Sequence, residues 1–196
     1  TLSTQKTEYE FVGCLVGSYM CIRDRISMND DRRYIISVLV ENEFGSLSRI
    51  AGLFSARGYN IHCLNVAPTN DESISRMTIV TMCNENKINQ LMKQLDKLVD
   101  VVNVKDLTDE THIEREMLLL KLKCNKGQRE ELKRLVDIFR ARIIDVTDTT
   151  YTVELTGASE KIMAFVSSMG SINIIEMVRS GALGISRGKD SLENIK

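Results

Sequence analysis

The chain has 196 residues, of which 43% are hydrophobic and 27% charged, a composition typical of a globular protein with one medium domain or two small ones. Its 26 basic and 27 acidic residues nearly cancel, so there is no electrostatic case for binding nucleic acid or an anionic membrane. With no tryptophan and 5% aromatic residues, stacking on single-stranded nucleic acid is unsupported as well.

Residues 1–31 show no helical or strand period of useful length. Their apolar run at 11–22 is interrupted by Gly13 and Gly17 and is too short to span a bilayer. Acidic residues stand before it, where a signal peptide would carry positive charge. We therefore expect a tail that is disordered or extraneous to the fold, and that can be removed up to Met28 without loss of stability or function.

From residue 32 onward, the order strand, helix, strand, strand, helix, strand occurs twice. In each predicted helix the apolar residues recur at i, i+3, i+4 and i+7, which places them on one buried face. The four apolar sets are Leu47, Ile50, Ala51 and Phe54; Ile88, Leu91, Met92 and Leu95; Leu132, Leu135, Val136 and Phe139; and Ile162, Phe165, Val166 and Met169. The β-rich runs around them are residues 34–40, 61–68, 74–83, 101–107, 117–124, 143–147, 151–156 and 172–179.

This order is that of the ferredoxin-like fold, an antiparallel sheet with helices on one face. The predicted class is α+β, with two ferredoxin-like (βαββαβ) domains. The predicted parts are a first domain at 32–107, a linker at 108–113, a second domain at 114–188 and a tail at 189–196. Asn84 and Ser159 are predicted helix N-caps, and Gly58 a left-handed C-cap. Because one face of each sheet is left uncovered, we expect the protein to dimerise.

The five cysteines are odd in number and contain no C-x-x-C pair; they are Cys14, Cys21, Cys63, Cys83 and Cys124. This predicts reduced thiols in a cytoplasmic compartment and no disulfide framework. Zinc would need clustered ligands, and the two histidines, His62 and His112, are far from any cysteine pair. His62 adjoins one cysteine, but neighbouring residues of a strand point to opposite faces. No metal site is predicted.

A candidate binding site lies at the first strand-to-helix turn, within residues 41–50. Asn42 ends the first strand, and Gly45 directly precedes the first helix. The free N–H groups of a helix start attract a carboxylate, and the amides of Asn42 and Asn60 could accept hydrogen bonds from an ammonium group. The pattern predicts a pocket for a free amino acid. Gly45 by itself has a second explanation, since many such turns need a residue with positive φ.

The sequence offers little for catalysis. It contains no G-x-S-x-G motif and only two histidines, so a catalytic triad is unsupported. Glu114 and Glu116, like Asp145 and Asp148, are spaced as paired carboxylates, but a solvated surface position is the commoner role for such residues. The glycine-rich stretch 181–188 lacks nucleotide-binding spacings and is predicted to be a flexible turn. No catalytic residue is predicted.

An ordered series of segments carries a family resemblance from about Arg32 to Gly188. The segments are residues 33–61, 66–69, 75–79, 94–101, 114–116, 143–147, 179–181 and 186–188. Residue for residue, the first part resembles an ACT domain, a regulatory module that binds small effectors. The whole series is similar to the small regulatory subunits of acetolactate synthase (acetohydroxyacid synthase).

The resemblance implies that the first domain is an ACT domain that binds free valine, and that the chain is not itself an enzyme. In this family the valine pocket lies across a homodimer interface. The residues that correspond to it here are Asn42, Gly45, Ser46, Leu47, Asn60 and Ile61. Phe44 and the pair His62-Cys63 depart from the family pattern beside this pocket, so the resemblance does not fix the effector preference.

The resemblance also implies a partner, the large catalytic subunit of acetolactate synthase. Thiamine diphosphate, magnesium and FAD are expected on that partner, and no cofactor on this chain. The chain would activate the large subunit and confer feedback inhibition by valine in branched-chain amino-acid biosynthesis, including that of isoleucine. Neither nucleic acid nor a membrane is expected as a partner.

Two other functions remain open. The chain could be an ACT-type amino-acid sensor that regulates another pathway enzyme or transcription, or a ferredoxin-like metal regulator. A basic DNA-binding segment would favour the first alternative, and clustered histidine and cysteine the second. The sequence contains neither feature.

Overall fold

The computed structural model describes residues 31–189 and 191–192. The predicted dispensable tail at 1–31 falls almost wholly outside the described residues. In the described part of the chain, none of the helices combines the length and the apolar character needed to cross a membrane.

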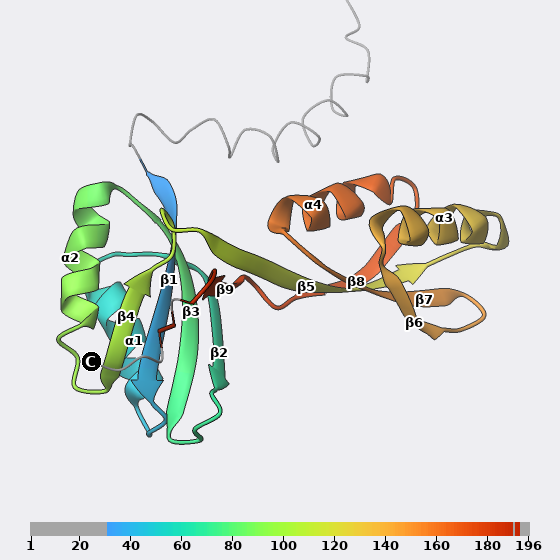
Figure 1. The fold of residues 1–196 in the computed structure, drawn as a ribbon. Helices are drawn as coiled ribbons and strands as arrows, with labels where there is room; N and C mark the ends of the chain where they lie inside the picture. The colour runs from blue at the N-terminus through green and yellow to red at the C-terminus, as the bar shows by residue number, and fades with distance from the viewer. Residues whose placement is uncertain (1–30, 190, 193–196) are drawn as a thin grey trace, which may run out of the picture. The chain divides into compact units, whose positions relative to one another are not determined.

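The first half of the described chain forms one βαββαβ unit (Figure 1). Its elements are β1 (Arg32–Glu41), α1 (Ser46–Ala56), β2 (Ile61–Pro68), β3 (Ile74–Cys83), α2 (Glu85–Leu95) and β4 (Val101–Asp106). The strands form an antiparallel sheet in the order β2-β3-β1-β4. Because β1 and β2 are both antiparallel to β3, they run parallel to each other, with α1 as their crossover.

The second half repeats the same arrangement. Its elements are β5 (His112–Lys123), the 3₁₀ turn η1 (Lys126–Gln128), α3 (Arg129–Phe139), β6 (Arg142–Val146), β7 (Thr150–Gly157), α4 (Ser159–Ser168) and β8 (Asn173–Arg179). The strand order β6-β7-β5-β8 is equivalent to that of the first sheet, and α3 lies beside α4 (Figure 1). The prediction of an α+β protein with two ferredoxin-like units is confirmed.

Each unit packs its two helices on one face of its sheet. In the first core, Ile36 and Val38 of β1 meet Phe54 of α1 and Leu91 of α2, all at most 1% exposed. The second core is built likewise from both helices and the strands β5 and β7. Most residues of the apolar helix sets predicted from spacing contribute to these cores. Leu47, in the first turn of α1, is 45% exposed.

The helix-free face of the first sheet is partly covered by the end of the chain. The short strand β9 (Leu183–Ser186) pairs with the first four residues of β5. Ile35 and Val80 on this face form a small cluster with Leu107 and Ala182, and all four are buried. The expectation of a bare face is therefore wrong for this part of the first sheet, because a segment more than 100 residues away packs on it. Dimerisation stays a prediction.

The segment between the two units is held to β1 by hydrogen bonds. The backbone N–H of Leu107 donates to the carbonyl of Ile35 at 2.9 Å. The backbone N–H of Ile35 in turn donates to Thr108 Oγ1 at 3.0 Å. Strand β5 begins at His112, inside the range predicted as a linker. Strand β9 lies within the range given to the second domain but pairs only with the start of β5. The predicted domain limits stay a prediction.

Two of the three predicted helix ends are confirmed. Asn84 is the N-cap of α2 and accepts from the N–H of Lys87 at 3.0 Å. Gly58 follows α1 with φ of 67°, which glycine adopts without strain. The prediction for Ser159 is wrong by one residue: Ala158 is the N-cap of α4. The Ser159 hydroxyl accepts instead from Arg179 Nη2 at 3.2 Å, a partner that its local sequence does not show.

Candidate functional site

The turn between β1 and α1 leaves the helix start open. Gly45 is the residue before the helix and has φ of 94°, a left-handed conformation that strains any residue with a Cβ. No side chain among the described residues caps this end of the helix. The N–H of Ser46 makes only a long hydrogen bond, 3.4 Å, to the carbonyl of Glu43. The helix start thus presents backbone donors and its positive dipole end.

The hydroxyl of Ser46 lies at the same helix start. The residue is 3% exposed, and its Oγ finds no hydrogen-bond partner among the described residues. A buried hydroxyl left in this state costs about 1–3 kcal/mol. An acceptor or donor from a ligand would remove that cost.

A cationic group lies beside the same turn. Arg49 Nε donates to Asp100 Oδ2, and this hydrogen bond raises the pKa of Arg49. A Cβ on Gly45 would lie 3.6 Å from Arg49 Nη1, so the guanidinium is directly next to the glycine. Asp100 is 6% exposed and its carbonyl accepts from the N–H of Glu41 at 2.8 Å. Arg49 was not among the residues predicted from the sequence, although its place four residues after Gly45 on a helix was a usable signal.

Asn42 follows β1 and lines a pocket of about 440 Å³, together with Glu43 and Ser73. Its Nδ2 donates to the carbonyl of Glu72 at 2.9 Å, and its backbone N–H donates to the carbonyl of Ser73 at 2.7 Å. The side chain is therefore held against the β2–β3 hairpin. With the amide nitrogen engaged, the amide oxygen is the atom that Asn42 can offer to a donor.

Asn60 and Ile61 lie at the other end of the sheet. The carbonyl of Asn60 accepts from Thr81 Oγ1 at 2.8 Å, and Ile61 pairs with the same threonine. From Ile61 to Pro68, which is level with the end of β1, the strand advances seven residues, about 23 Å at about 3.3 Å per residue. The structure brings together Asn42, Gly45, Ser46 and Leu47 but not Asn60 and Ile61. A single pocket formed by the residues around Gly45 together with Asn60 and Ile61 therefore needs a second copy of the chain.

Exposed apolar residues flank Gly45 in the sequence, and another precedes Asp100. Phe44 is fully exposed, Leu47 is 45% exposed and Val99, next to Asp100, is 92% exposed. Of these, Val99 was not predicted from the sequence as a site residue. Exposed aliphatic side chains beside a helix start are suited to a ligand that is charged at one end and apolar at the other.

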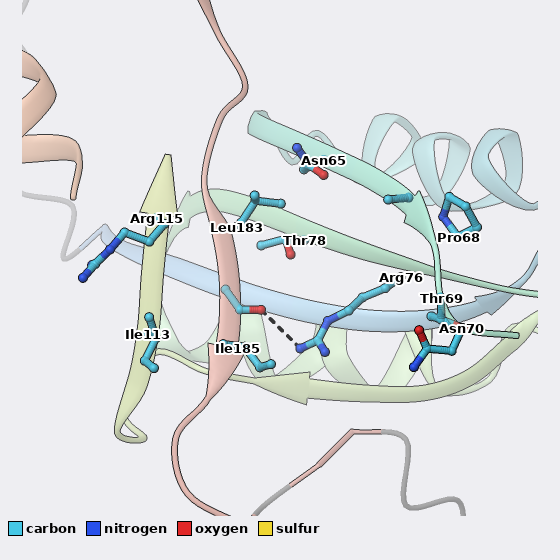
Figure 2. Close-up of a pocket in the computed structure, with 12 residues that line it drawn as sticks. Asn65, Pro68, Thr69, Asn70, Arg76, Thr78, Ile113, Arg115, Leu183 and Ile185 are labelled. Carbon is cyan, nitrogen blue, oxygen red and sulfur yellow. Dashed lines mark hydrogen bonds between the residues drawn. The ribbon is translucent and has the colours of Figure 1, made fainter. Parts of the chain in front are cut away.

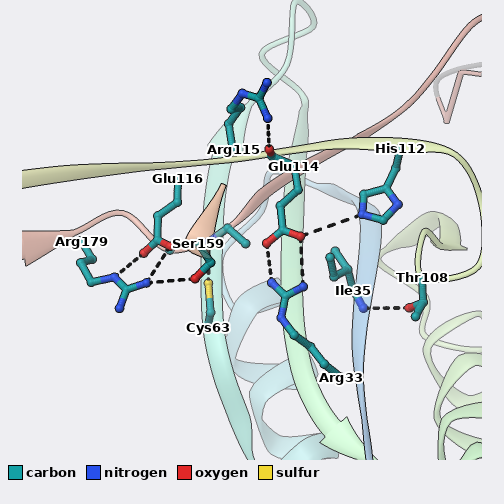
Figure 3. Close-up of polar contacts among 12 residues, drawn as sticks. Arg33, Ile35, Cys63, Thr108, His112, Glu114, Arg115, Glu116, Ser159 and Arg179 are labelled. Carbon is teal, nitrogen blue, oxygen red and sulfur yellow. Dashed lines mark hydrogen bonds and ion pairs between the residues drawn. The ribbon is translucent and has the colours of Figure 1, made fainter. Parts of the chain in front are cut away.

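The carboxylates of β5 are paired with arginines, as Figure 3 shows. Arg33 donates two hydrogen bonds to Glu114. Arg179 donates to both oxygens of Glu116, at 2.6 Å and 2.8 Å, and this pairing lowers the pKa of Glu116. The expectation that Glu114 and Glu116 are solvated surface residues is wrong, because their partners lie 81 and 63 residues away in the sequence. A lowered pKa also does not favour Glu116 as a general acid.

Nothing in the described part of the chain resembles a metal centre, since no group of three or more histidine, cysteine, aspartate or glutamate side chains gathers there. The described cysteines are Cys63, Cys83 and Cys124, and the last two are buried. Cys63 Sγ accepts from the N–H of Ala182 at 3.1 Å, and burial raises the pKa of its thiol. These cysteines therefore have packing roles in the described fold.

Comparison with known proteins assigns both units. Residues 36–103 match the family described as the AHAS small subunit-like ACT domain, which places the first unit in the ACT class of domains. Residues 115–188 match the family described as the small subunit of acetolactate synthase.

Relatives cover most of the chain. Acetolactate synthase isozyme 3 small subunit of Salmonella typhimurium is 54% identical over 157 residues, 80% of this chain and 96% of that protein. The acetolactate synthase small subunit of Aquifex aeolicus is 43% identical, over 80% of this chain and 82% of that protein. The crystal structure of the acetolactate synthase small subunit from Thermotoga maritima matches with a TM-score of 0.76 and 34% identity, over 81% of this chain and 99% of that one. The chain belongs to the family of acetolactate synthase small subunits.

Proposed function

We propose that this protein is a non-catalytic regulatory subunit that binds valine at the start of α1. The proposal rests on one observation: the uncapped helix start at Gly45 lies beside the buried, unpartnered hydroxyl of Ser46. The guanidinium of Arg49 adds positive charge next to the same glycine. Helix-start donors, a hydroxyl and a cation together favour a carboxylate.

In the proposed complex, the valine carboxylate accepts from the backbone N–H groups of Ser46 and Leu47 and from the Ser46 hydroxyl. The Asn42 amide oxygen accepts from the ammonium group, and the isopropyl group packs on Leu47. Because Asn60 and Ile61 lie at the far end of the same sheet, they would complete the pocket from a second copy in a homodimer. Removing one neutral hydrogen bond from such a site costs about 0.5–1.5 kcal/mol.

The proposed partner is the large catalytic subunit of acetolactate synthase, with the chemistry and its cofactors on that subunit. Binding of this chain would activate the partner, and valine would inhibit the complex in branched-chain amino-acid biosynthesis. Feedback needs only that valine bind two states of the complex with different affinity. A coupling of about 1–3 kcal/mol, or about 5–150-fold in affinity, is typical.

Gly45→Asp tests the binding site by placing a carboxylate where the ligand carboxylate would bind. Gly170→Asp is the matched control, because Gly170 has a positive φ of 53°, as Gly45 does of 94°. Gly170 lies after α4, away from the proposed site, and a Cβ there would meet no atom within 4 Å. Both variants carry a similar backbone strain of about 1–2 kcal/mol. Calorimetry should show that valine affinity falls at least about tenfold, about 1.4 kcal/mol, in Gly45→Asp only. If both variants bind valine equally, the site lies elsewhere.

Reconstitution with the cognate large subunit tests the regulatory role. The chain alone should have no acetolactate synthase activity, and it should raise the activity of the large subunit and make it sensitive to valine. Gly45→Asp should keep the activation and lose the inhibition. If the chain fails to associate, or leaves the activity unchanged, an ACT-type sensor for another enzyme or for transcription becomes the better proposal.

A further inference from the structure

After β8 the chain crosses the helix-free face of the first sheet, as Figure 2 shows for β9. We call this crossing segment the strap; it consists of residues 180–189 and 191–192 and contains β9. At its start, the N–H of Ser180 donates to the carbonyl of Met117 in β5 at 3.0 Å. The strap thus leaves from the second unit and runs across the first.

Amide side chains of two strands hold the ends of the strap. Asn65 Nδ2 of β2 donates to the carbonyl of Ser180 at 3.3 Å, and Asn103 Nδ2 of β4 donates to the carbonyl of Leu192 at 2.9 Å. Strands β2 and β4 are the two edges of the first sheet. The strap therefore spans the whole width of this sheet.

The middle of the strap lies close against the first sheet. Arg76 Nη2 of β3 donates to the carbonyl of Gly184 at 3.2 Å (Figure 2). A Cβ on Gly184 would lie 3.0 Å from Leu107 Cδ1 and 3.4 Å from Ile35 Cγ2. The first distance is shorter than an ordinary contact between carbon atoms, about 3.5–4.0 Å. A branched side chain at this position would therefore press the strap away from the sheet.

The strap is attached by few buried side chains. Of its described residues, Ala182, Gly184 and Leu192 are buried, whereas Leu183 and Ile185 are 46% and 51% exposed. The core of each unit, by contrast, buries apolar side chains from both helices and from several strands. Segments with few buried apolar contacts open at a lower free energy than the cores do.

We propose that the strap opens and closes as a single unit while both cores stay folded. It has no core of its own, and its two ends and its middle are held by side chains of the first sheet. In the closed form, the strap ties the end of β8 to both edges of that sheet. In the open form this tie is lost and the second unit stays connected through β5. The strap is thus a conformational lock between the two units.

The far end of the strap is anchored on the strand that borders the proposed valine site. Asn103, which holds Leu192, is three residues after Asp100 in the sequence. Asp100 in turn binds Arg49 beside Gly45. A ligand that fixes the start of β4 should favour the closed strap. This consequence rests on the proposed function, whereas the opening of the strap does not.

Hydrogen exchange of the full-length, ¹⁵N-labelled protein tests the proposal. The N–H of Ala182 donates to Cys63 Sγ, and the N–H of Arg187 donates to the carbonyl of Thr111. We expect these two N–H groups to be protected to the same degree, and to exchange at least about tenfold faster than those of β3 and β7, which are inner strands of the two sheets. Exchange as slow as in β3 and β7 would overturn the proposal.

Substitutions at two distant positions test whether the strap opens as one unit. Gly184→Val presses on the sheet in the middle of the strap, and Leu192→Ala removes a buried side chain at its end. Each should speed the exchange of both Ala182 and Arg187 at least about fivefold and leave β3 and β7 unchanged. If Leu192→Ala leaves Ala182 unchanged, the strap does not open as one unit and the proposal is overturned.

Gly127→Val is the matched control for Gly184→Val. Neither glycine has a positive φ, and a Cβ on Gly127 would meet no atom within 4 Å. The control should therefore leave the exchange of the strap unchanged. Equal acceleration in both valine variants would refute the role of the close contact at Gly184.

Valine added to the wild-type protein tests the link to the proposed site. It should slow the exchange of Ala182 and Arg187 at least about threefold. If valine binds at Gly45 but leaves these rates unchanged, the link is refuted and the proposed function stands. If valine does not bind at all, the proposed function is refuted, and the strap variants still decide whether the strap opens as one unit.

Discussion

Glu116→Gln removes the charge of a buried carboxylate while it keeps the shape of the side chain. Glu116 is 5% exposed and binds Arg179 through both oxygens. Hydrogen bonds to charged groups contribute about 1.5–3 kcal/mol, and breaking a fully buried pair costs about 3–5 kcal/mol. Because the Arg179 side chain is 34% exposed, water takes over part of the interaction that the substitution removes. We therefore expect a loss of about 2 kcal/mol in the free energy of unfolding.

Urea unfolding measures this loss, and the same strand pair supplies a control. Glu176 of β8 pairs with Lys121 of β5 at 3.3 Å, but these side chains are 60% and 45% exposed. Glu176→Gln should therefore cost less than about 0.5 kcal/mol. The slope of free energy against urea should be unchanged in both variants. Equal losses in the two variants would refute the argument that burial makes the Glu116 pair the stronger one.

The difference between wild type and Glu116→Gln should also depend on pH. The hydrogen bonds from Arg179 lower the pKa of Glu116 in the folded state. The ionised Glu116 therefore contributes its full stabilisation at pH values above the unfolded-state pKa of glutamate, about 4.3. This contribution is lost as the pH falls through the pKa of Glu116 in the folded protein. The difference should thus be constant near neutral pH and shrink in acid. A difference that grew below about pH 4 would contradict this sign.

Two further substitutions test the packing and the capping of the units. Phe165→Ala should cost about 3–5 kcal/mol in urea unfolding, because Phe165 is fully buried and packs edge-to-face on Phe139 with ring centroids 5.3 Å apart. Met163→Ala, on the same helix but 55% exposed, should change stability by less than about 0.5 kcal/mol, and a large loss there would mean that Met163 is covered. Asn84→Ala should cost about 1 kcal/mol in thermal unfolding through loss of the cap to Lys87; no loss would mean that solvent replaces the cap.

The order of elements could be predicted from the sequence because it depends on short-range patterns. The apolar spacing of the helices and the β-rich runs between them identify both βαββαβ units. Gly58 and Asn84 could be placed because their roles depend on the backbone within a few residues. Ser159 was misplaced by one position because its hydroxyl binds Arg179, a residue of another strand.

The pairing of β5 with β9 could not be predicted in the same way. Gly184 lies in a glycine-rich stretch with no alternation, yet it pairs with Glu114, 70 residues earlier in the sequence. Its pairing depends on the tight approach of β9 to the first sheet, which only the folded chain reveals. The same applies to the candidate site. The open turn at Gly45 follows from local sequence, whereas the guanidinium of Arg49 is held there by Asp100, 51 residues away.

Strand β5 connects the two units by strand pairing. Its first four residues pair with β9, and its later residues pair with β7 and β8. Glu114 and Glu116, two positions apart on this strand, bind arginines of β1 and β8 respectively. A flexible linker could change conformation when β1 moves and leave the second unit in place. We expect a continuous strand with these two ion pairs to resist bending between Glu114 and Glu116. We therefore expect a ligand that moves β1 either to break the pair between Arg33 and Glu114 or to move β5 as well.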